Sequence, residues 1–209
     1  RRLSPQQAEK ITKMADAAVE ILADGGFDAL TVRDVAKRAG VAPATAYTYF
    51  SSKSHLVAEV FWRRLAAGVP EPDLSLPAAE RVAQVLRGVS MVVAGEGQLG
   101  GAVTVALLGS DPDSEHLRWR IGGFIHDRLS VAVGTDHPDH ERVVDALQML
   151  YAGGLVTAGM GHLTYEATSE RLVAAAAVLR IVEGVEVLVD LAVAVDDDDV
   201  PLAAWVLEG

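Results

Sequence analysis

The sequence predicts an all-α fold, and two observations lead to that prediction. Apolar residues recur at the three- and four-residue spacing of one helix face, first at Ile11, Ala15 and Ala18 and then in successive segments. No segment alternates apolar and polar residues between hairpin turns, as the strands of an antiparallel sheet do. Half of the 209 residues are apolar, so the chain can bury a core in one domain or in two small ones.

The first helix is marked at both ends. Ser4 and Gln7 have the spacing of a capping box, and Pro5 suits the first helical position because its missing N–H needs no partner there. At the other end, Gly25 and Gly26 are expected to end the helix, because glycine readily adopts the left-handed backbone that closes many helices.

Residues 31–53 predict two short helices and the start of a third. Thr31 can cap the first of them with Asp34 at the third position, and Gly40 supplies the left-handed residue that ends it. Pro43 suits the start of the second helix. A helix, a glycine-containing turn and a short second helix form a helix-turn-helix, which places its second helix in the major groove of DNA.

The second helix of this motif has two distinct faces. Ala46 and Phe50 lie four residues apart and are expected to point inward. The opposite face carries small, hydroxyl-bearing or aromatic residues, namely Pro43, Ala44, Tyr47 and Thr48.

Arg33 and Lys53 fall in the first turns of two helices if Thr31 and Ser51 are the N-caps. Positive charge is unfavourable there because of the helix dipole. A helix N-terminus with a nearby cation is, however, a ready site for phosphate. We therefore expect both side chains to contact the DNA backbone; the alternative is that both are solvated surface residues.

Within this segment the sequence resembles the DNA-binding signature of the TetR family of bacterial repressors. The resemblance extends over about residues 7–61 and rests on Gly40, Val41, Thr45, Tyr47, Phe50, Ser52, Lys53 and Leu56. Three positions depart from the family pattern: Ala42 stands where a capping serine is usual, Ala46 where leucine is common, and Ser54 where glutamate is common. The resemblance implies a DNA-binding head followed by a helical domain for effector binding and dimerisation.

The charge is distributed unevenly along the chain. The formal net charge is −11, which by itself argues against a nucleic-acid partner. From residue 1 to residue 64, however, ten Lys and Arg stand against seven Asp and Glu, a balance of +3, whereas the remainder has eight against twenty-two, a balance of −14. A DNA-binding head on an acidic body would have this asymmetry.

The predicted architecture is an N-terminal three-helix helix-turn-helix head, joined by a fourth helix to a helical bundle. The fourth helix begins at Ser51 and ends near Gly68, and segment 69–76 has two prolines and no helical period. We place the boundary there, with a DNA-binding domain at residues 1–68 and an effector-binding and dimerisation domain at residues 77–209. Further helices are expected at 77–94, 98–108, 114–133, 139–163 and 169–195, the last stopped by the acidic run 196–199.

The two longest predicted helices carry small residues that suit close packing. Glycine inside a helix is less stable than alanine by about 1 kcal/mol, so it usually permits another backbone to approach. An antiparallel pair with such faces can dimerise as a four-helix bundle, which the family resemblance also implies. The residues assigned to this interface are Gly153, Gly154, Gly159, Gly161, Ala175 and Ala176. The alternative is that these helices pack only within one core.

The resemblance also implies an effector pocket in the second domain. Large, adaptable side chains are core residues by default, but a repressor of this family leaves some of them around an apolar cavity. The candidates are Met91, Trp119, Phe124, His126, Met149, Tyr151, Thr157 and Met160.

Two motifs have the residue types of cofactor or metal sites without the required context. Residues 95–100 match GxGxxG, but no strand precedes them and no βαβ unit surrounds them, so we expect an inter-helix loop. Residues 136–141 fall in a loop and the start of a helix, so their side chains do not form the i,i+4 pair on one helix face that helical zinc sites use. His126 and Asp127 are neighbours that face different ways on a helix. We therefore expect no enzyme activity, cofactor or metal.

Together these features predict a cytoplasmic homodimeric repressor of TetR type that reads a pseudo-palindromic double-stranded operator and responds to a small, apolar effector. The absence of cysteine and of a long uncharged apolar run fits that compartment. DNA contacts are assigned to Thr31, Arg33, Pro43, Ala44, Thr45, Tyr47, Thr48, Tyr49 and Lys53. The second motif helix lacks Arg, Lys, Asn and Gln, so specificity is expected from thymine methyls, hydroxyl groups and DNA shape.

The alternative function is a helical ligand-binding or interaction protein that no longer reads DNA. The sequence leaves open the operator, the regulated genes, the effector's identity and whether the protein represses or activates. It also leaves open whether an N-terminal arm is present, because the chain begins with Arg1 rather than Met.

Overall fold

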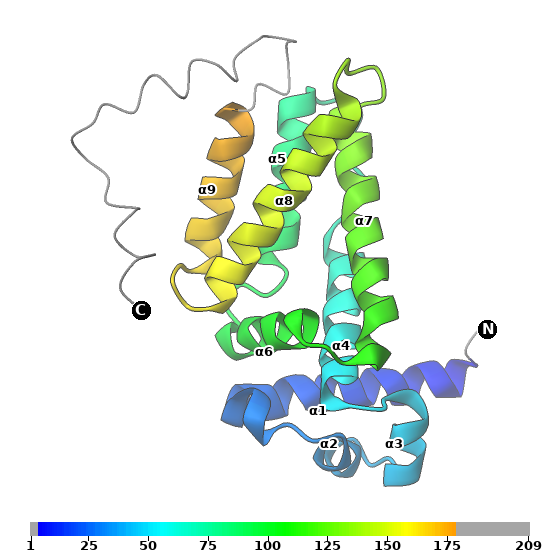
Figure 1. The fold of residues 1–209 in the computed structure, drawn as a ribbon. Coiled ribbons are helices and arrows are strands. Elements are labelled where there is room, and N and C mark those ends of the chain that lie inside the picture. The colour runs from blue at the N-terminus through cyan, green and yellow to red at the C-terminus, as the bar shows by residue number, and fades with distance from the viewer. Residues whose placement is uncertain (1–3, 179–209) are drawn as a thin grey trace.

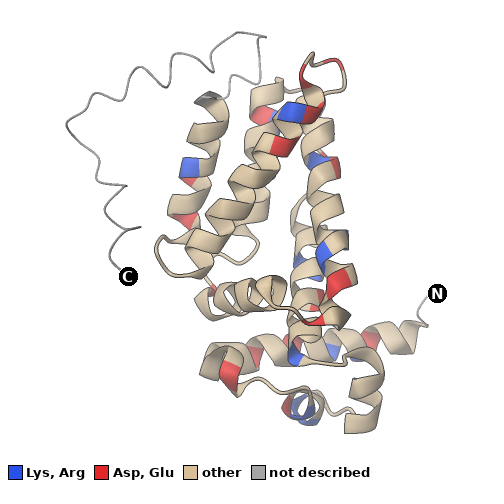
Figure 2. Ribbon diagram, in the orientation of Figure 1, with Lys and Arg blue, Asp and Glu red and all other residues tan. Residues whose placement is uncertain are grey.

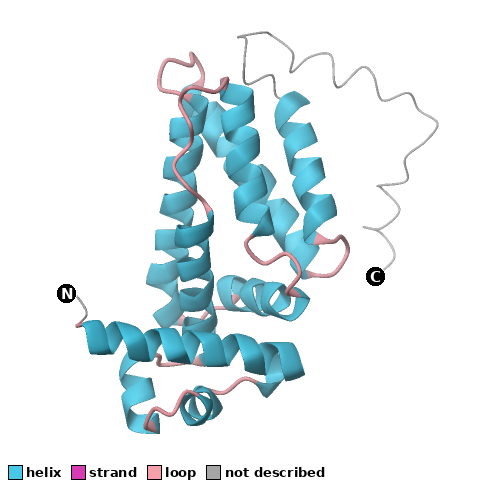
Figure 3. Cartoon of the chain, turned by 180° about the vertical axis from the view of Figure 1, so that it is seen from behind, coloured by secondary structure: helices cyan, strands magenta, loops and turns pink. Residues whose placement is uncertain are grey.

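A computed structural model describes residues 4–178, and every regular element in that range is a helix (Figures 1 and 3). The head consists of α1 (Pro5–Ala29), α2 (Val32–Arg38) and α3 (Pro43–Tyr49), and α4 (Lys53–Gly68) rises from it. The body consists of α5 (Ala78–Met91), α6 (Gly97–Leu108), the short 3-10 helix η1 (Pro112–Ser114), α7 (Glu115–Val133), α8 (His140–Gly159) and α9 (Tyr165–Val178). The predicted all-α fold is confirmed for this part of the chain.

Local capping bonds fix the start and end of α1. The Ser4 hydroxyl accepts the N–H of Gln7 at 3.2 Å, and the Gln7 side chain accepts the N–H of Ser4 at 2.8 Å, which completes the predicted capping box. Gly26 takes a φ of 67°, in the left-handed region. The chain turns there as expected, but helical structure then resumes as far as Ala29, so the predicted stop is a kink.

The motif helices α2 and α3 are set by their turn. The Thr31 hydroxyl accepts the N–H of Asp34 at 3.0 Å, and Gly40 ends the helix with a φ of 66°. The N–H of Val41 reaches back to the carbonyl of Ala36 at 2.9 Å, a bond typical of a Schellman cap.

One prediction about α4 is wrong by a residue. Its N-cap is Ser52 rather than Ser51, because the Ser52 hydroxyl accepts the N–H of His55 at 3.0 Å. Lys53 still opens the helix.

The helix α6 lies across the molecule, between the head and the upright helices of the body (Figure 1). It packs on α1 and α4, while α4 also packs on α1 and α7. Above α6 in Figure 1, the helices α5, α7, α8 and α9 pack on one another in pairs. The head therefore meets the body through α4 and α6.

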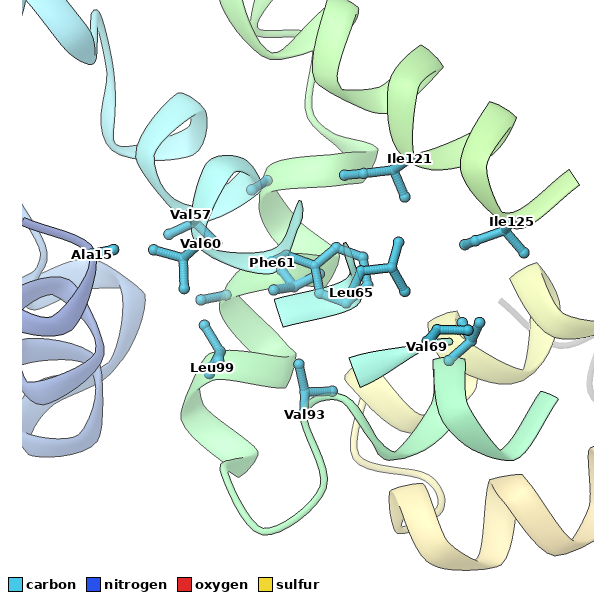
Figure 4. Packing of buried hydrophobic residues seen from close by; sticks show 14 of the residues in the cluster. Ala15, Val57, Val60, Phe61, Leu65, Val69, Val93, Leu99, Ile121 and Ile125 are labelled. Atoms are coloured by element: carbon cyan, nitrogen blue, oxygen red, sulfur yellow. The ribbon is translucent and has the colours of Figure 1, made fainter. Parts of the chain in front are cut away.

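The apolar core is continuous from the head into the body. Figure 4 shows Val57 and Val60 of α4 facing α1, and Phe61 and Leu65 lying towards α7, near Ile121. All five of these side chains are at most 5% exposed. Burial of such a side chain contributes roughly 1.5–3 kcal/mol, so α4 is held firmly on both sides.

Several boundaries in the body differ from the predicted ones. The helix α6 begins at Gly97, so part of the segment predicted as an inter-helix loop is helical. The helix α8 ends at Gly159, and α9 begins at Tyr165 because the Thr164 hydroxyl accepts the N–H of Ala167 at 3.1 Å. The remainder of the last predicted helix and the acidic run 196–199 lie outside the described residues. The division into domains at 1–68 and 77–209 stays a prediction.

Candidate DNA-binding face and apolar cavity

The helix α3 is anchored on one side and open on the other. Ala46 and Phe50 are 0% and 2% exposed, as predicted, and the Phe50 ring packs edge-on against His55 of α4. On the opposite side Tyr47 is 53% exposed. The helix carries no charged residue (Figure 2), so its outer surface consists of small, hydroxyl-bearing and aromatic groups.

No described side chain caps the start of α3. Ala42 occupies the N-cap position, and no side-chain bond closes the first turn. Pro43 and Ala44 are exposed beside it, whereas Thr45 is half-buried. The Thr48 hydroxyl donates to the carbonyl of Ala44 at 3.0 Å and is thus engaged within its own helix.

At the start of α2, Arg33 is exposed and has no ion-pair partner among the described residues. By contrast, Arg38 at the other end of α2 lies 3.3 Å from the carboxylate of Asp24 on α1. The Thr31 hydroxyl donates to the carboxylate of Asp34 at 2.6 Å besides accepting its N–H, so both of its hydrogen-bonding roles are used within the chain.

Lys53 has a structural contact that the sequence did not reveal. Its ammonium donates to the carbonyl of Phe27 at 3.0 Å and lies 4.2 Å from the centroid of the Phe27 ring. The lysine therefore ties the start of α4 to the end of α1. An ammonium has three donors, so this contact leaves others for a phosphate. Tyr49, also assigned to phosphate, is half-buried against the core.

The body contains an apolar cavity of about 210 Å³ that is partly open to solvent. Its apolar wall comes from α4, α6, α7 and α8 and the loop before α6, and includes Phe61, Val93, Val103, Leu107, Leu108, Ile121, Ile125, Leu155 and Val156. Four polar side chains interrupt that wall: Thr104, Arg118, Tyr151 and Tyr165. Because its walls come from several helices around α4, the cavity lies next to the element that carries α3.

The two tyrosines are neutral hydrogen-bonding groups. Burial raises the pKa of Tyr151 to about 12, because a phenolate is poorly solvated there. Burial also raises the pKa of Tyr165, and a hydrogen bond with Thr104 opposes that shift. Both phenols therefore stay protonated at neutral pH.

Of the eight residues expected at an effector pocket, Tyr151 alone lines this cavity. Four others lie on the surface: Trp119 is 76% exposed, Met149 78%, Met160 65% and Met91 44%. Their size suggested a pocket, but helix geometry turns them outward. On α7 the inward positions are Ile121 and Ile125, which the three- and four-residue spacing of apolar residues does mark.

The three remaining pocket candidates have other partners. The Phe124 ring packs edge-on against Trp62 at 5.4 Å between centroids. A ring nitrogen of His126 lies 3.0 Å from Gln148, and the Thr157 hydroxyl donates to the carbonyl of Gly153 at 2.8 Å. None of the three lines the cavity.

The small residues assigned to a dimer interface have mixed environments. A methyl group added at Gly154 would meet Leu172 of α9, and one added at Gly159 would collide with Thr104 of α6, so both glycines permit packing within the chain. Gly161 follows the end of α8. Ala176 is buried and Ala175 is half-buried. Gly153 alone of the six is exposed along a helix with open space beside it.

The histidines of segment 136–141 serve local structure. The two ring nitrogens of His140 lie 3.0 Å from the Ser130 hydroxyl and 2.8 Å from the carbonyl of Gly134, so both are engaged. His137 accepts the N–H of Asp139 at 3.1 Å. Within the residues described, no three His, Asp or Glu side chains are grouped to hold a metal ion.

A helix-turn-helix head with an open second helix, joined by α4 to a helical body that contains an apolar cavity, is the architecture of a DNA-binding regulator. Comparison with known proteins gives the same class. The profile described as "Bacterial regulatory proteins, tetR family" matches residues 15–60. A helix-turn-helix transcriptional regulator of Mycobacterium tuberculosis is 43% identical over 169 residues, which span 80% of this chain and 78% of the relative.

Solved structures share the fold at lower identity. A TetR transcriptional regulator from Rhodococcus sp. RHA1 superposes with a TM-score of 0.70 at 20% identity, over 87% of this chain and all of that one. FadR of Bacillus subtilis, solved with stearoyl-CoA, superposes with a TM-score of 0.60 at 21% identity, over 84% of this chain and 99% of that one. The chain belongs to the TetR family of bacterial transcriptional regulators, and the resemblance seen in its sequence is confirmed.

Proposed function

We propose that this regulator binds a pseudo-palindromic operator as a homodimer and leaves it when a small, largely apolar effector occupies the cavity. The observation that carries the proposal is the course of α4. The helix α4 begins at Lys53, shortly after the end of α3, the recognition helix that would enter the major groove. Farther along α4, Phe61 lines the cavity. A ligand that displaces Phe61 therefore acts on the element that holds α3. The shift can be only as large as the ligand's differential affinity for the two arrangements of the protein.

The DNA contacts follow from the open face of α3. Without Arg, Lys, Asn or Gln, the helix has no bidentate reader of guanine or adenine. Pro43, Ala44 and Thr45 would then contact thymine methyls, with the exposed Tyr47 and Thr48 adding hydroxyl contacts and DNA shape adding the rest. Lys53 and Tyr49 would contact phosphates, and Arg33 would contact a phosphate or a base edge; the lack of an ion-pair partner for Arg33 among the described residues supports its part most directly. Thr31 would contact a phosphate only after its hydroxyl exchanges the carboxylate of Asp34 for it.

A homodimer is supported by an exposed apolar stripe along α8. Met149, Gly153 and Met160 are spaced to share one side of the helix, and all three are exposed in the single chain. A two-fold pair of such helices would bury this stripe, and a dimer that reads two adjacent half-sites needs its two α3 helices about 34 Å apart, one turn of DNA. The protein would act in the cytoplasm, where its operator lies; no described helix has the length and apolar character needed to cross a membrane.

The experiment that tests operator binding is fluorescence anisotropy on the DNA upstream of the protein's own gene, at two salt concentrations, with unrelated DNA as control. Tight, salt-sensitive and selective binding is expected, because phosphate contacts release counterions. Thr45→Ala and Tyr47→Ala should reduce discrimination between operator and control DNA by roughly tenfold each. If both variants discriminate between operator and control DNA as well as the wild type does, α3 does not read the operator as assigned.

A further inference from the structure

Among the described residues that line the cavity, one side chain carries a formal charge. Arg118 lies near the N-terminus of α7 and lines the cavity together with Ile121 and Ile125. Its guanidinium donates to two backbone carbonyls, of Gly109 at 3.1 Å and of Asp111 at 3.2 Å. Among the side chains that the structure describes, it has no carboxylate within ion-pair distance.

The positive charge of Arg118 is only partly balanced by the groups around it. A positive charge near a helix N-terminus is opposed by the helix dipole, and the half-buried Arg118 keeps only part of its hydration. Carbonyl dipoles satisfy some of its N–H groups, and none of the described carboxylates is close enough to serve as its counter-ion. A guanidinium has five donors in a fork that matches a carboxylate, so donors remain for a ligand.

The remaining polar atoms of the cavity favour the same ligand chemistry. Tyr151 is a neutral phenol that can donate a hydrogen bond to an anion, and among the described residues no carboxylate lines the cavity to repel one. The volume of about 210 Å³ exceeds the roughly 150 Å³ that holds a benzene ring. A compact alkyl or aromatic body with one anionic end fits both the size and the polarity.

The two carbonyls held by Arg118 belong to the segment that meets the DNA-binding head. The Ser52 hydroxyl, which caps α4, donates to the carboxylate of Asp111 at 2.5 Å. Beside this bond, His55 of α4 packs edge-on between Phe50, at the end of α3, and His116 of α7. Arg118 therefore braces a segment that touches the start of α4 and the end of the recognition helix.

We propose that the cavity takes a small amphipathic monocarboxylate whose head group pairs with Arg118, and that this pairing draws Arg118 away from the segment that Ser52 holds. The inference rests on the proposed function, since it names the chemistry of the effector and the contact through which it acts. Ligand and operator would then favour different positions of Arg118.

The test uses three probes with the same alkyl chain and different heads: octanoate, octanol and octylamine. Calorimetric titration of the wild-type protein should give tightest binding for octanoate, then octanol, with octylamine weakest. Arg118→Met should weaken octanoate binding by about 10-fold or more and leave octanol within about threefold, because a charge-assisted pair is lost and the apolar wall is kept. Arg87→Met removes an exposed arginine on α5 and is the matched control.

Arg118→Lys should retain part of the preference for octanoate, which guards against a variant that merely folds poorly. Octanol binding as tightly as octanoate to the wild type would overturn the carboxylate assignment. Equal losses for octanoate and octanol in Arg118→Met, with the wild-type Tm retained, would also do so, because Arg118 would then contribute nothing specific to the carboxylate.

Operator binding, measured by anisotropy in the same samples, separates this inference from the proposed function. Octanoate should weaken operator binding, and Asp111→Ala should reduce that effect while octanoate still binds. If octanol releases the operator as well as octanoate does, the apolar-effector function stands and the role of Arg118 is refuted. If the protein binds no operator at all, the proposed function fails, whatever the probes do.

Discussion

Replacing Lys53 by methionine tests two roles of one side chain. In the structure its ammonium lies 3.0 Å from the Phe27 carbonyl and 4.2 Å from the Phe27 ring centroid. A hydrogen bond to a charged group contributes about 1.5–3 kcal/mol and an exposed cation–π contact about 0.5–1 kcal/mol. Both contacts use one half-exposed ammonium and are not additive, so we expect a loss of about 1–2 kcal/mol of folding free energy. For a chain of this size that lowers Tm by roughly 2–8 °C.

The same substitution has a separate signature on DNA. Each phosphate contact contributes about 0.9 to the slope of log affinity against log salt, and a dimer has two copies of Lys53. The slope should therefore fall by about 2, so that raising salt from about 50 to 200 mM weakens the wild type about tenfold more than Lys53→Met. The assay is anisotropy across a salt series, with thermal unfolding followed by circular dichroism on the same preparations.

Two variants separate the roles. Phe27→Leu removes the ring contact but keeps the lysine charge, so it should lower Tm and leave the salt slope unchanged. Arg87→Met, in the body and without an ion pair among the described residues, should change neither. If Lys53→Met lowers Tm while its salt slope equals that of the wild type, Lys53 only braces α4 and the phosphate assignment is refuted.

Three further predictions concern stability. Ala42→Ser should supply the missing cap of α3 and stabilise the protein by about 0.5–2 kcal/mol, and an unchanged Tm would contradict it. Gly159→Ala should destabilise by roughly 1–3 kcal/mol because the added methyl meets Thr104, whereas Gly123→Ala, with open space, should not lower Tm. Folding raises the pKa of Tyr151 to about 12, so its neutral form stabilises the folded protein fully below its ordinary pKa of 10.0, and this stabilisation is lost as pH rises towards 12. When the free energy of unfolding is measured with denaturant at about pH 9 and 11, it should fall less between the two pH values in Tyr151→Phe than in the wild type. An equal fall would rule out this titration.

Local patterns in the sequence predicted the head well. The cap at Thr31 and the turn at Gly40 depend on bonds between residues a few positions apart, which spacing alone can indicate. Spacing does not separate Ser51 from Ser52 as the next cap, because two adjacent serines have the same capping chemistry. The Lys53–Phe27 contact joins residues 26 positions apart, and no local pattern marks it.

The cavity was harder to predict because it depends on how five helices meet. The size of Trp119 and Met149 makes them pocket candidates, yet helix orientation places both on the surface. Ile121 lies on the inward face that its spacing marks, but spacing cannot tell a filled core from a cavity. The glycines of α8 show the same limit: Gly154 and Gly159 do permit close packing, but against α9 and α6 of the same chain.

The most direct test of the account is the reciprocity between effector and operator. The tightest binder among octanoate, octanol and octylamine would be titrated calorimetrically into the free protein and into the protein saturated with its operator. Linkage requires the operator to weaken ligand binding by the same factor by which the ligand weakens operator binding. We predict weaker binding to the operator complex, by about 5- to 150-fold, the usual range of such coupling. Equal affinity of the ligand for the free and the operator-bound protein would contradict the account, because such a ligand cannot release the DNA.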